Sequence, residues 1–402
     1  MTAPRPIWDK LVGQDLVVTE LSRAVADAEH IRRGEHGPGM THAWLITGPP
    51  GSGRSTAATC FAAALVCPED GCGVCEACRT APFGGHADVD IVATEGVEFK
   101  VDEARDLVRR SEMSPIKSPW HVIVVEDADR MNDFAVNVLL KSLEEPPPHT
   151  VWILCAPSVE DVLPTIASRT RLVPLRTPSS ADVAQLLIDN YSVDAAMASF
   201  AARASQGHIG RARALARDEH ARMRRQEVMR IPLNLHDVPS CFANAGNLLG
   251  AATDDAKAIT DPIDDAENLN LRAQFGDTAG SDGSTRSRVK RMVDAATKDL
   301  VKKQKARVTR VVRDQVDRAL VDLMGLYRDV LVIQVDGDVP LINEEMRPQL
   351  SQLAERSTPN DTGRRLQALA YARQQLVARV TPLLALESLM VELKDPWIRV
   401  AL

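Results

Sequence analysis

The sequence predicts an α/β domain with a parallel sheet, followed by segments that are entirely helical. Over the first 175 residues, short apolar runs alternate with helical patterns, as they do in βαβ units. Beyond that point no strand pattern occurs, and apolar residues recur at steps of three or four. The expected domains are 1–176 for the α/β domain, 177–217 for a small helical domain and 218–402 for a helical C-terminal domain.

Four stretches of the first domain are predicted strands, because each is a short run of apolar and β-branched residues. They are 43–47, 89–93, 121–126 and 151–156. Helical patterns separate them, over 55–66, 102–113 and 133–145. In the small helical domain, Ser179 or Ser180 is expected to cap the first helix.

The C-terminal domain is predicted to contain a long helix with one apolar face. The residues that define this face are Val308, Val312, Val316, Ala319, Leu323, Leu326 and Val330. Residues 250–285 are acidic first and rich in Gly and Ser afterwards, a composition that favours a flexible loop.

The net charge of −7 argues against a general attraction to nucleic acid, so any DNA contact needs a local patch. Residues 286–313 hold eleven Lys and Arg against two Asp. They indicate either a contact with DNA or polymerase, or a solvated helix face balanced by the acidic stretch before it. No signal peptide and no apolar run of about 18 residues occur, so we expect a cytoplasmic protein without a membrane span.

The stretch GPPGSGRS at 48–55 follows a predicted strand and opens a predicted helix, which is the setting of a phosphate-binding loop. Glycines in such a loop let backbone N–H groups approach phosphates, and hydroxyls after them hold magnesium. The glycines are Gly48, Gly51 and Gly53, and the hydroxyl residues are Ser55 and Thr56. The alternative is a glycine-rich turn without a ligand.

Other positions of this nucleotide site depart from the usual pattern. Arg54 stands where the loop normally carries Lys, and a planar guanidinium does not replace an ammonium at a tight phosphate site. Glu126 ends the third predicted strand and Asp127 follows it, in the reverse of the usual order of Asp and then Glu. They are either a degenerate magnesium and water-activating pair or solvent-facing ends of a strand. We therefore expect the binding of ATP and magnesium to be weak or absent.

Four cysteines lie close together with the spacing C-x4-C-x2-C-x2-C, which predicts a tetrahedral zinc site. They are Cys67, Cys72, Cys75 and Cys78. Because four thiolates leave no open position, the expected role of the zinc is structural. The alternative is a chance cluster of thiols without a ligand. The other three cysteines, Cys60, Cys155 and Cys241, are predicted to be small buried hydrophobic residues.

Taken with the loop and the cysteines, the stretches LLKSLEEPPPHTVWIL at 139–154 and SRT at 168–170 resemble the bacterial clamp-loader subunits of the AAA+ family. The resemblance covers 7–217 closely and continues more faintly to the end of the chain. It implies an AAA+ domain, a helical lid and a C-terminal collar that joins subunits into a ring. It also implies that Val12, Gly13 and Gln14 lie near an adenine pocket.

Within that family the altered positions resemble delta prime subunits, which do not hydrolyse ATP, more than the gamma and tau motor subunits. Motor subunits carry a polar pair where this chain has Ala156 and Pro157, and a lid arginine where it has Gly210. Arg211 is one residue later, roughly 100° around the helix. An active ATPase of gamma or tau type is the alternative; a branch-migration helicase is disfavoured by the cysteine module and by LEEPPPHT.

The resemblance assigns Arg169 as an arginine finger that acts in the ATP site of a neighbouring subunit. It implies a hetero-pentameric ring with gamma or tau and delta subunits, which loads the sliding clamp on primed DNA for DNA polymerase III in the nucleoid-associated replisome. The isolated chain is then not expected to be a competent ATPase. Complex membership alone connects it to DNA-directed DNA polymerase activity, because no residue resembles a polymerase active site.

Overall fold

The computed structural model describes residues 6–94, 98–274, 283–378 and 380–398. Contacts divide the chain into two compact units, Met1–Arg217 and Asp218–Leu402. Within the described residues, no helix combines the length and the apolar character that crossing a bilayer requires.

The first unit contains a five-stranded sheet in which every neighbouring pair is parallel, as predicted. Its order is β2-β3-β4-β1-β5. The strands are β1 (Ala43–Thr47), β2 (Val89–Val92), β3 (His121–Val125), β4 (Thr150–Ala156) and β5 (Arg171–Pro174). The four predicted strands are confirmed, whereas β5 was not predicted. Only Val173 of β5 is buried, so this edge strand shows too short an apolar run to be recognised.

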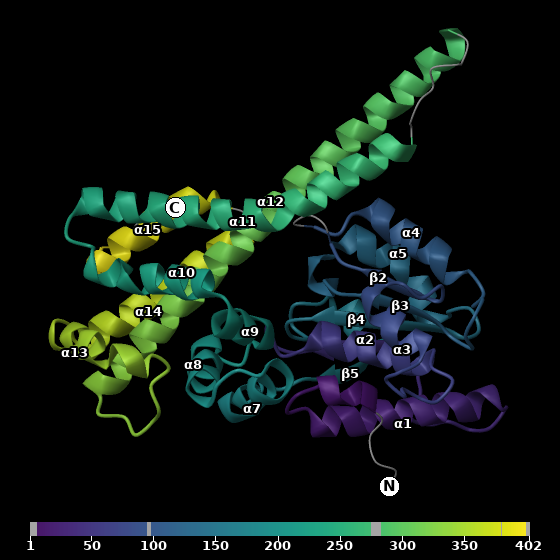
Figure 1. Ribbon diagram of the computed structural model, residues 1–402, viewed down its shortest axis with the longest axis horizontal. Coiled ribbons are helices and arrows are strands. Elements are labelled where there is room, and N and C mark those ends of the chain that lie inside the picture. Colours follow the sequence, from purple (N-terminus) through teal and green to yellow (C-terminus); the bar gives the residue numbers. More distant parts are fainter. Residues whose placement is uncertain (1–5, 95–97, 275–282, 379, 399–402) are drawn as a thin grey trace. The chain divides into compact units, whose positions relative to one another are not determined.

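Helices cover both faces of the sheet because alternate strand residues point to opposite sides (Figure 1). On one face, α1 (Asp15–Arg32) and α2 (Arg54–Leu65) pack against Trp44, Ile46 and neighbouring residues. On the other face, the helices are α4 (Val101–Ser111) and α5 (Asp133–Glu144). The predicted helices over these ranges are confirmed. Two hydrophobic cores thus hold the sheet rigidly between them.

Short elements and a helical lid complete the first unit. The short elements are η1 (Pro6–Lys10), α3 (Glu76–Thr80), η2 (Ala81–Phe83), η3 (Ala128–Arg130) and α6 (Pro164–Ala167). The lid consists of α7 (Ser180–Tyr191), α8 (Ala195–Ser205) and α9 (Ile209–Arg217). Ser179 caps α7 by accepting a hydrogen bond from the Asp182 N–H, which settles the choice between Ser179 and Ser180.

The second unit is helical throughout its described residues. Its elements are α10 (Glu219–Arg230), η4 (Ile231–Leu233), α11 (Val238–Gln274), α12 (Gly283–Gln334), η5 (Glu344–Met346), α13 (Arg347–Glu355), α14 (Pro359–Val377) and α15 (Pro382–Lys394). α11 and α12 lie side by side and extend beyond the other helices of the unit (Figure 1). The apolar face predicted on α12 is confirmed, since Val316, Leu323 and Leu326 are fully buried.

The flexible loop predicted over 250–285 is wrong for most of its length. Residues 250–274 belong to α11, residues 275–282 lie outside the described part of the chain, and α12 begins at Gly283. Buried residues recur at every fourth position of α11, namely Ala252, Ala256 and Thr260. On α12, Arg307 contacts the Asp264 carboxylate of α11 at 2.6 Å, so tertiary packing overrides the acidic composition.

Candidate functional sites

The predicted phosphate-binding loop connects β1 to α2 at the carboxyl edge of the sheet. Gly51 has φ +84° and Gly53 has φ +95°, a region that L side chains rarely adopt. The Gly48 N–H donates to the Ala156 and Pro157 carbonyls at 3.3 and 3.1 Å, so the loop starts against the end of β4. Ser55 and Thr56 lie in the first turn of α2, with Ser55 exposed.

Arg54, the first residue of α2, faces an acidic surrounding. Its Nη1 atom is buried and has no hydrogen-bond partner among the described residues. Burial, and next the charge of Asp127, raises the pKa of the Asp129 carboxyl, while the positive charges of Arg130 and Arg54 oppose this shift. Arg54 therefore contributes positive charge to an acidic cluster of the protein itself.

The two acidic residues after β3, Glu126 and Asp127, lie at the same edge of the sheet. The Asp127 carboxylate accepts a hydrogen bond from the Thr94 N–H at 3.0 Å and lies 3.7 Å from the Arg130 Nε. The Glu126 N–H donates to the Val92 carbonyl at 2.9 Å, which extends the β2–β3 pairing by one residue. Asp127 is thus held toward the end of β2.

The lid contacts the phosphate-binding loop directly. A Cβ added to Gly51 would lie 2.2 Å from Cγ and 2.5 Å from Cα of His208, and the Ile209 N–H reaches the Gly51 carbonyl at 3.4 Å. Gln14 ties the loop to the start of the lid, because its Nε2 donates to the Arg176 carbonyl at 2.6 Å and the Ser52 carbonyl at 3.5 Å. The loop is therefore held by Gln14 and His208 of the same chain.

Three positions at which the resemblance expects other residues in a motor subunit, Ala156, Pro157 and Gly210, lie next to this loop or to His208, which contacts it. Ala156 is buried and accepts the Gly48 N–H, with Pro157 next to it. Gly210 lies beside the His208 ring, since a Cβ placed on Gly210 would be 3.4 Å from His208 Cε1. The structure thus brings together the altered positions that the sequence places far apart.

Arg169 lies at the opposite edge of the sheet, just before β5 begins. β5 pairs with β1, so about six residues of extended chain, roughly 20 Å, separate the level of Arg169 from that of Gly48. The Arg169 Nε contacts the Glu144 Oε1 at 2.5 Å, and its Nη1 donates to the Thr165 carbonyl at 2.9 Å. About one third of the side chain is exposed. Arg169 is therefore remote from the phosphate-binding loop of its own chain.

The four predicted ligand cysteines come together, with all four sulfur atoms within 4.8 Å of one another. The Cys67 sulfur lies 3.7 Å from those of Cys72 and Cys75. A tetrahedral site with Zn–S bonds of about 2.3 Å has S···S edges of about 3.8 Å. N–H groups of Val74 and Cys75 lower the pKa of Cys72 to about 7, while burial raises that of Cys78. This group could hold a metal ion. The remaining cysteines, Cys60, Cys155 and Cys241, are buried as predicted.

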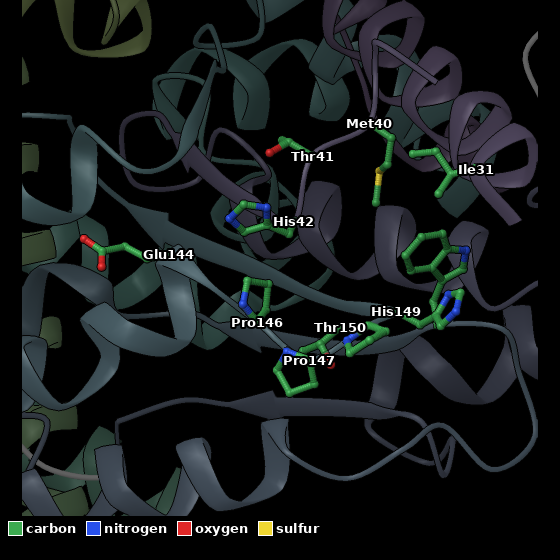
Figure 2. Close-up of a pocket in the computed structure, with 11 residues that line it drawn as sticks. Ile31, Met40, Thr41, His42, Glu144, Pro146, Pro147, His149 and Thr150 are labelled. Carbon is green, nitrogen blue, oxygen red and sulfur yellow. The ribbon is translucent and has the colours of Figure 1, made fainter. Parts of the chain in front are cut away.

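A pocket of about 450 Å³ lies at the amino ends of β1, β3 and β4 (Figure 2). Met40, Trp120 and Pro147 supply apolar lining, and the Trp120 and His149 rings meet edge to face at 5.3 Å. Glu144, the ion-pair partner of Arg169, also lines this pocket. The pocket is thus on the same edge as Arg169.

Comparison with known proteins shows which family the first unit is similar to. Residues 28–179 match the family described as DNA polymerase III, delta subunit. The DNA polymerase III subunit gamma/tau of Mycobacterium tuberculosis is 35% identical over 172 residues, which cover 42% of this chain and 28% of that protein. Residues 28–179 are thus similar to clamp-loader subunits of the AAA+ family. The delta prime subunit of Pseudomonas aeruginosa is 39% identical over 134 residues, which cover 32% of this chain and 41% of that protein.

The matched segments span less than half the length of both relatives, so the match concerns the AAA+ domain and not their complete proteins. The alignment with a solved structure of a gamma subunit-related protein from Thermotoga maritima covers 92% of this chain and 99% of that chain, at 16% identity and a TM-score of 0.38. That TM-score is too low to support a conclusion about fold or function.

Three residues of these sites were not recognised from the sequence. Asp129 continues the acidic run EDAD at 126–129, which is the sequence signal that could indicate it. The contact of His208 with Gly51 depends on tertiary structure, so no local sequence pattern indicates it. Glu144 has a signal in the sequence. A carboxylate at the last residue of a helix lies at the negative end of the helix dipole, which is unfavourable, so it is expected to pair with a cation.

Proposed function

We propose that this chain is a delta prime-type clamp-loader subunit whose own nucleotide site is idle and which supplies Arg169 to the ATP site of a neighbouring subunit. The observation that carries the proposal is the convergence of altered positions around one phosphate-binding loop. Arg54, Ala156 and Gly210 meet there, and His208 lies against Gly51. None of these replacements supplies the lysine, polar sensor or lid arginine of a motor site.

The proposed partners are gamma or tau motors and a delta subunit in a pentameric ring that loads the sliding clamp on primed DNA. The second unit supports a collar role, because its long helices bury a continuous apolar core. The proposed location is the replisome in the cytoplasm. For the metal we propose structural zinc at the four cysteines, since four thiolates close the coordination sphere and leave no catalytic position.

The alternative, an active ATPase of gamma or tau type, is favoured by the match to the gamma/tau subunit of M. tuberculosis. It requires Arg54 to act as the loop lysine and Asp127 to act as the base. The contacts of Asp127 with Thr94 and Arg130 argue against that assignment. ATP hydrolysis by the isolated, metal-replete chain at a motor-like rate of about 1 s⁻¹ or more would establish the alternative.

We predict that Arg169→Ala leaves the complex assembled but lowers its DNA-stimulated ATPase. Arginine fingers contribute about 10³–10⁵ in rate, because the guanidinium stabilises charge that develops on the transferred phosphate. Since other motor interfaces keep their own fingers, the steady-state ATPase and the clamp-loading rate of the assembled complex are both measured, and clamp loading is expected to be nearly lost.

The matched control for this experiment is Arg33→Ala. Arg33 is an exposed arginine that is also ion-paired within the chain, to Glu29 at 3.0 Å. It should leave both rates unchanged. Normal clamp loading by a fully assembled Arg169→Ala complex would remove the finger assignment.

A further inference from the structure

The arginine assigned as the finger does not project freely, because its guanidinium is bonded on two of its three nitrogen atoms. Nε contacts Glu144 at 2.5 Å, and Nη1 donates to the Thr165 carbonyl at 2.9 Å and the Ser168 Oγ at 3.2 Å. Arginine has five N–H donors in a fixed planar fork. Nη2 makes no hydrogen bond with a described residue, so it is left to bind a ligand.

We propose that Glu144 is a positioning residue for Arg169, which fixes the plane of the guanidinium before a neighbouring nucleotide site is engaged. The inference rests on the proposed function of Arg169. Glu144 contacts Nε and the Thr165 carbonyl accepts from Nη1, and Nη2 remains available for phosphate oxygens. The carboxylate therefore orients the finger and does not itself touch nucleotide.

The location of Glu144 in the fold explains how its carboxylate is held accurately enough to orient Arg169. It is the last residue of α5, and Leu143 immediately before it is fully buried in the sheet core. α6, which carries Thr165, packs on α5. Both groups that hold Arg169 thus belong to helices anchored in one core, and sites built on such elements are held more accurately than sites on loops.

A purely stabilising role does not account for the pair. The Glu144 side chain is 47% exposed and that of Arg169 34% exposed, and ion pairs at such exposure contribute little to folding stability. The end of a helix is also an unfavourable place for a carboxylate, because the helix dipole is negative there. A position that is poor for stability but bonded to the finger fits a role in orientation.

The neighbouring residue offers a matched control. Glu145 is exposed, follows Glu144 directly and makes no ion pair with a described residue. Glu145→Ala removes the same charge from the same helix end without touching Arg169. It separates loss of orientation from a general change in surface charge.

The experiment measures the maximal clamp-loading rate, and the ATP concentration that gives half of this rate, in the reconstituted, DNA-stimulated complex that contains the full-length variants. We expect Glu144→Ala to lower the maximal clamp-loading rate by about 10-fold with little change in the ATP concentration for half of it, because a misplaced catalytic group costs rate and not binding. Glu144→Gln, which keeps an oxygen that can accept from Nε, should recover to within about 3-fold of the wild type. Glu145→Ala should match the wild type.

The outcomes separate this inference from the proposed function. If Arg169→Ala abolishes clamp loading while Glu144→Ala loads the clamp at the wild-type rate, the finger stands and the positioning role is overturned. The role is also overturned if Glu144→Ala and Glu144→Gln fall equally. If Arg169→Ala has no effect, the proposed function itself fails.

Discussion

Gly51 is the residue where the phosphate-binding loop and the lid meet most closely. Its positive φ alone disfavours any side chain, and a Cβ would in addition collide with both the ring and the backbone of His208. Gln14 closes the same contact from another side through the Ser52 and Arg176 carbonyls. Loop and lid are thereby joined by groups of the protein and do not depend on a nucleotide to connect them.

Replacing Gly51 by alanine tests this contact. We expect Gly51→Ala to lower the free energy of unfolding of the first unit by about 2–4 kcal/mol, of which about 1–2 kcal/mol comes from the left-handed backbone and the rest from the collision. Urea unfolding followed by tryptophan fluorescence reports on this unit, because Trp8, Trp44, Trp120 and Trp152 all lie in it.

Gly53→Ala is the matched control for Gly51→Ala. Gly53 has φ +95° but no atom within 4 Å of an added Cβ, so only the backbone cost of about 1–2 kcal/mol applies. Equal losses in the two variants would mean that His208 does not lie against the loop in solution.

At the scale of elements, the cysteine module shows how backbone geometry prepares a metal site. The Cys72 N–H points at the Cys67 sulfur and the Cys75 N–H at the Cys72 sulfur, both at 3.4 Å. Such bonds favour thiolates, which are the form that binds metal. Cys67 and Cys78 are buried in the core that α2 and the sheet share. The module is therefore continuous with the AAA+ core.

We predict about one equivalent of zinc in protein purified without chelator, and a near-complete loss of it in Cys72→Ser, because a hydroxyl does not replace a thiolate ligand. Elemental analysis gives the metal content, and thermal unfolding should show a lower Tm for the variant. Cys241→Ser, in the other unit, controls for loss of a buried thiol and should keep its zinc. Metal-free wild-type protein with an unchanged Tm would contradict the site.

Elements differ in how far they could be predicted from the sequence. β1, β3 and β4 are apolar runs between helical patterns, and the phosphate-binding loop and the cysteines have fixed spacings, so local pattern sufficed. α11 is different, because its inner face consists of small residues such as Ala252 and Ala256 within an acidic stretch. Its helix depends on pairing with α12, and the contact of His208 with Gly51 likewise depends on distant residues.

For the whole molecule, the two compact units separate the two tasks that we propose. The first unit contains the predicted phosphate-binding loop, Arg169 and the cysteine module. The second unit has its own core, in which Arg225 is buried with Asp322 at 3.3 Å and with Asn343. Because each unit closes its own core, the proposed finger Arg169 and the proposed collar are on separately folded parts.

The chain can therefore be cut between the units to test that division. We expect residues 1–217 alone to unfold cooperatively and to keep about one equivalent of zinc, since the sheet cores and the cysteine group lie entirely within them. The same fragment should fail to co-purify with the gamma or tau and delta subunits, because the proposed collar is missing. Residues 218–402 should enter the complex but give clamp loading as low as Arg169→Ala. A 1–217 fragment that assembled as well as the full chain would place the assembly surface in the AAA+ and lid domains and remove the collar role.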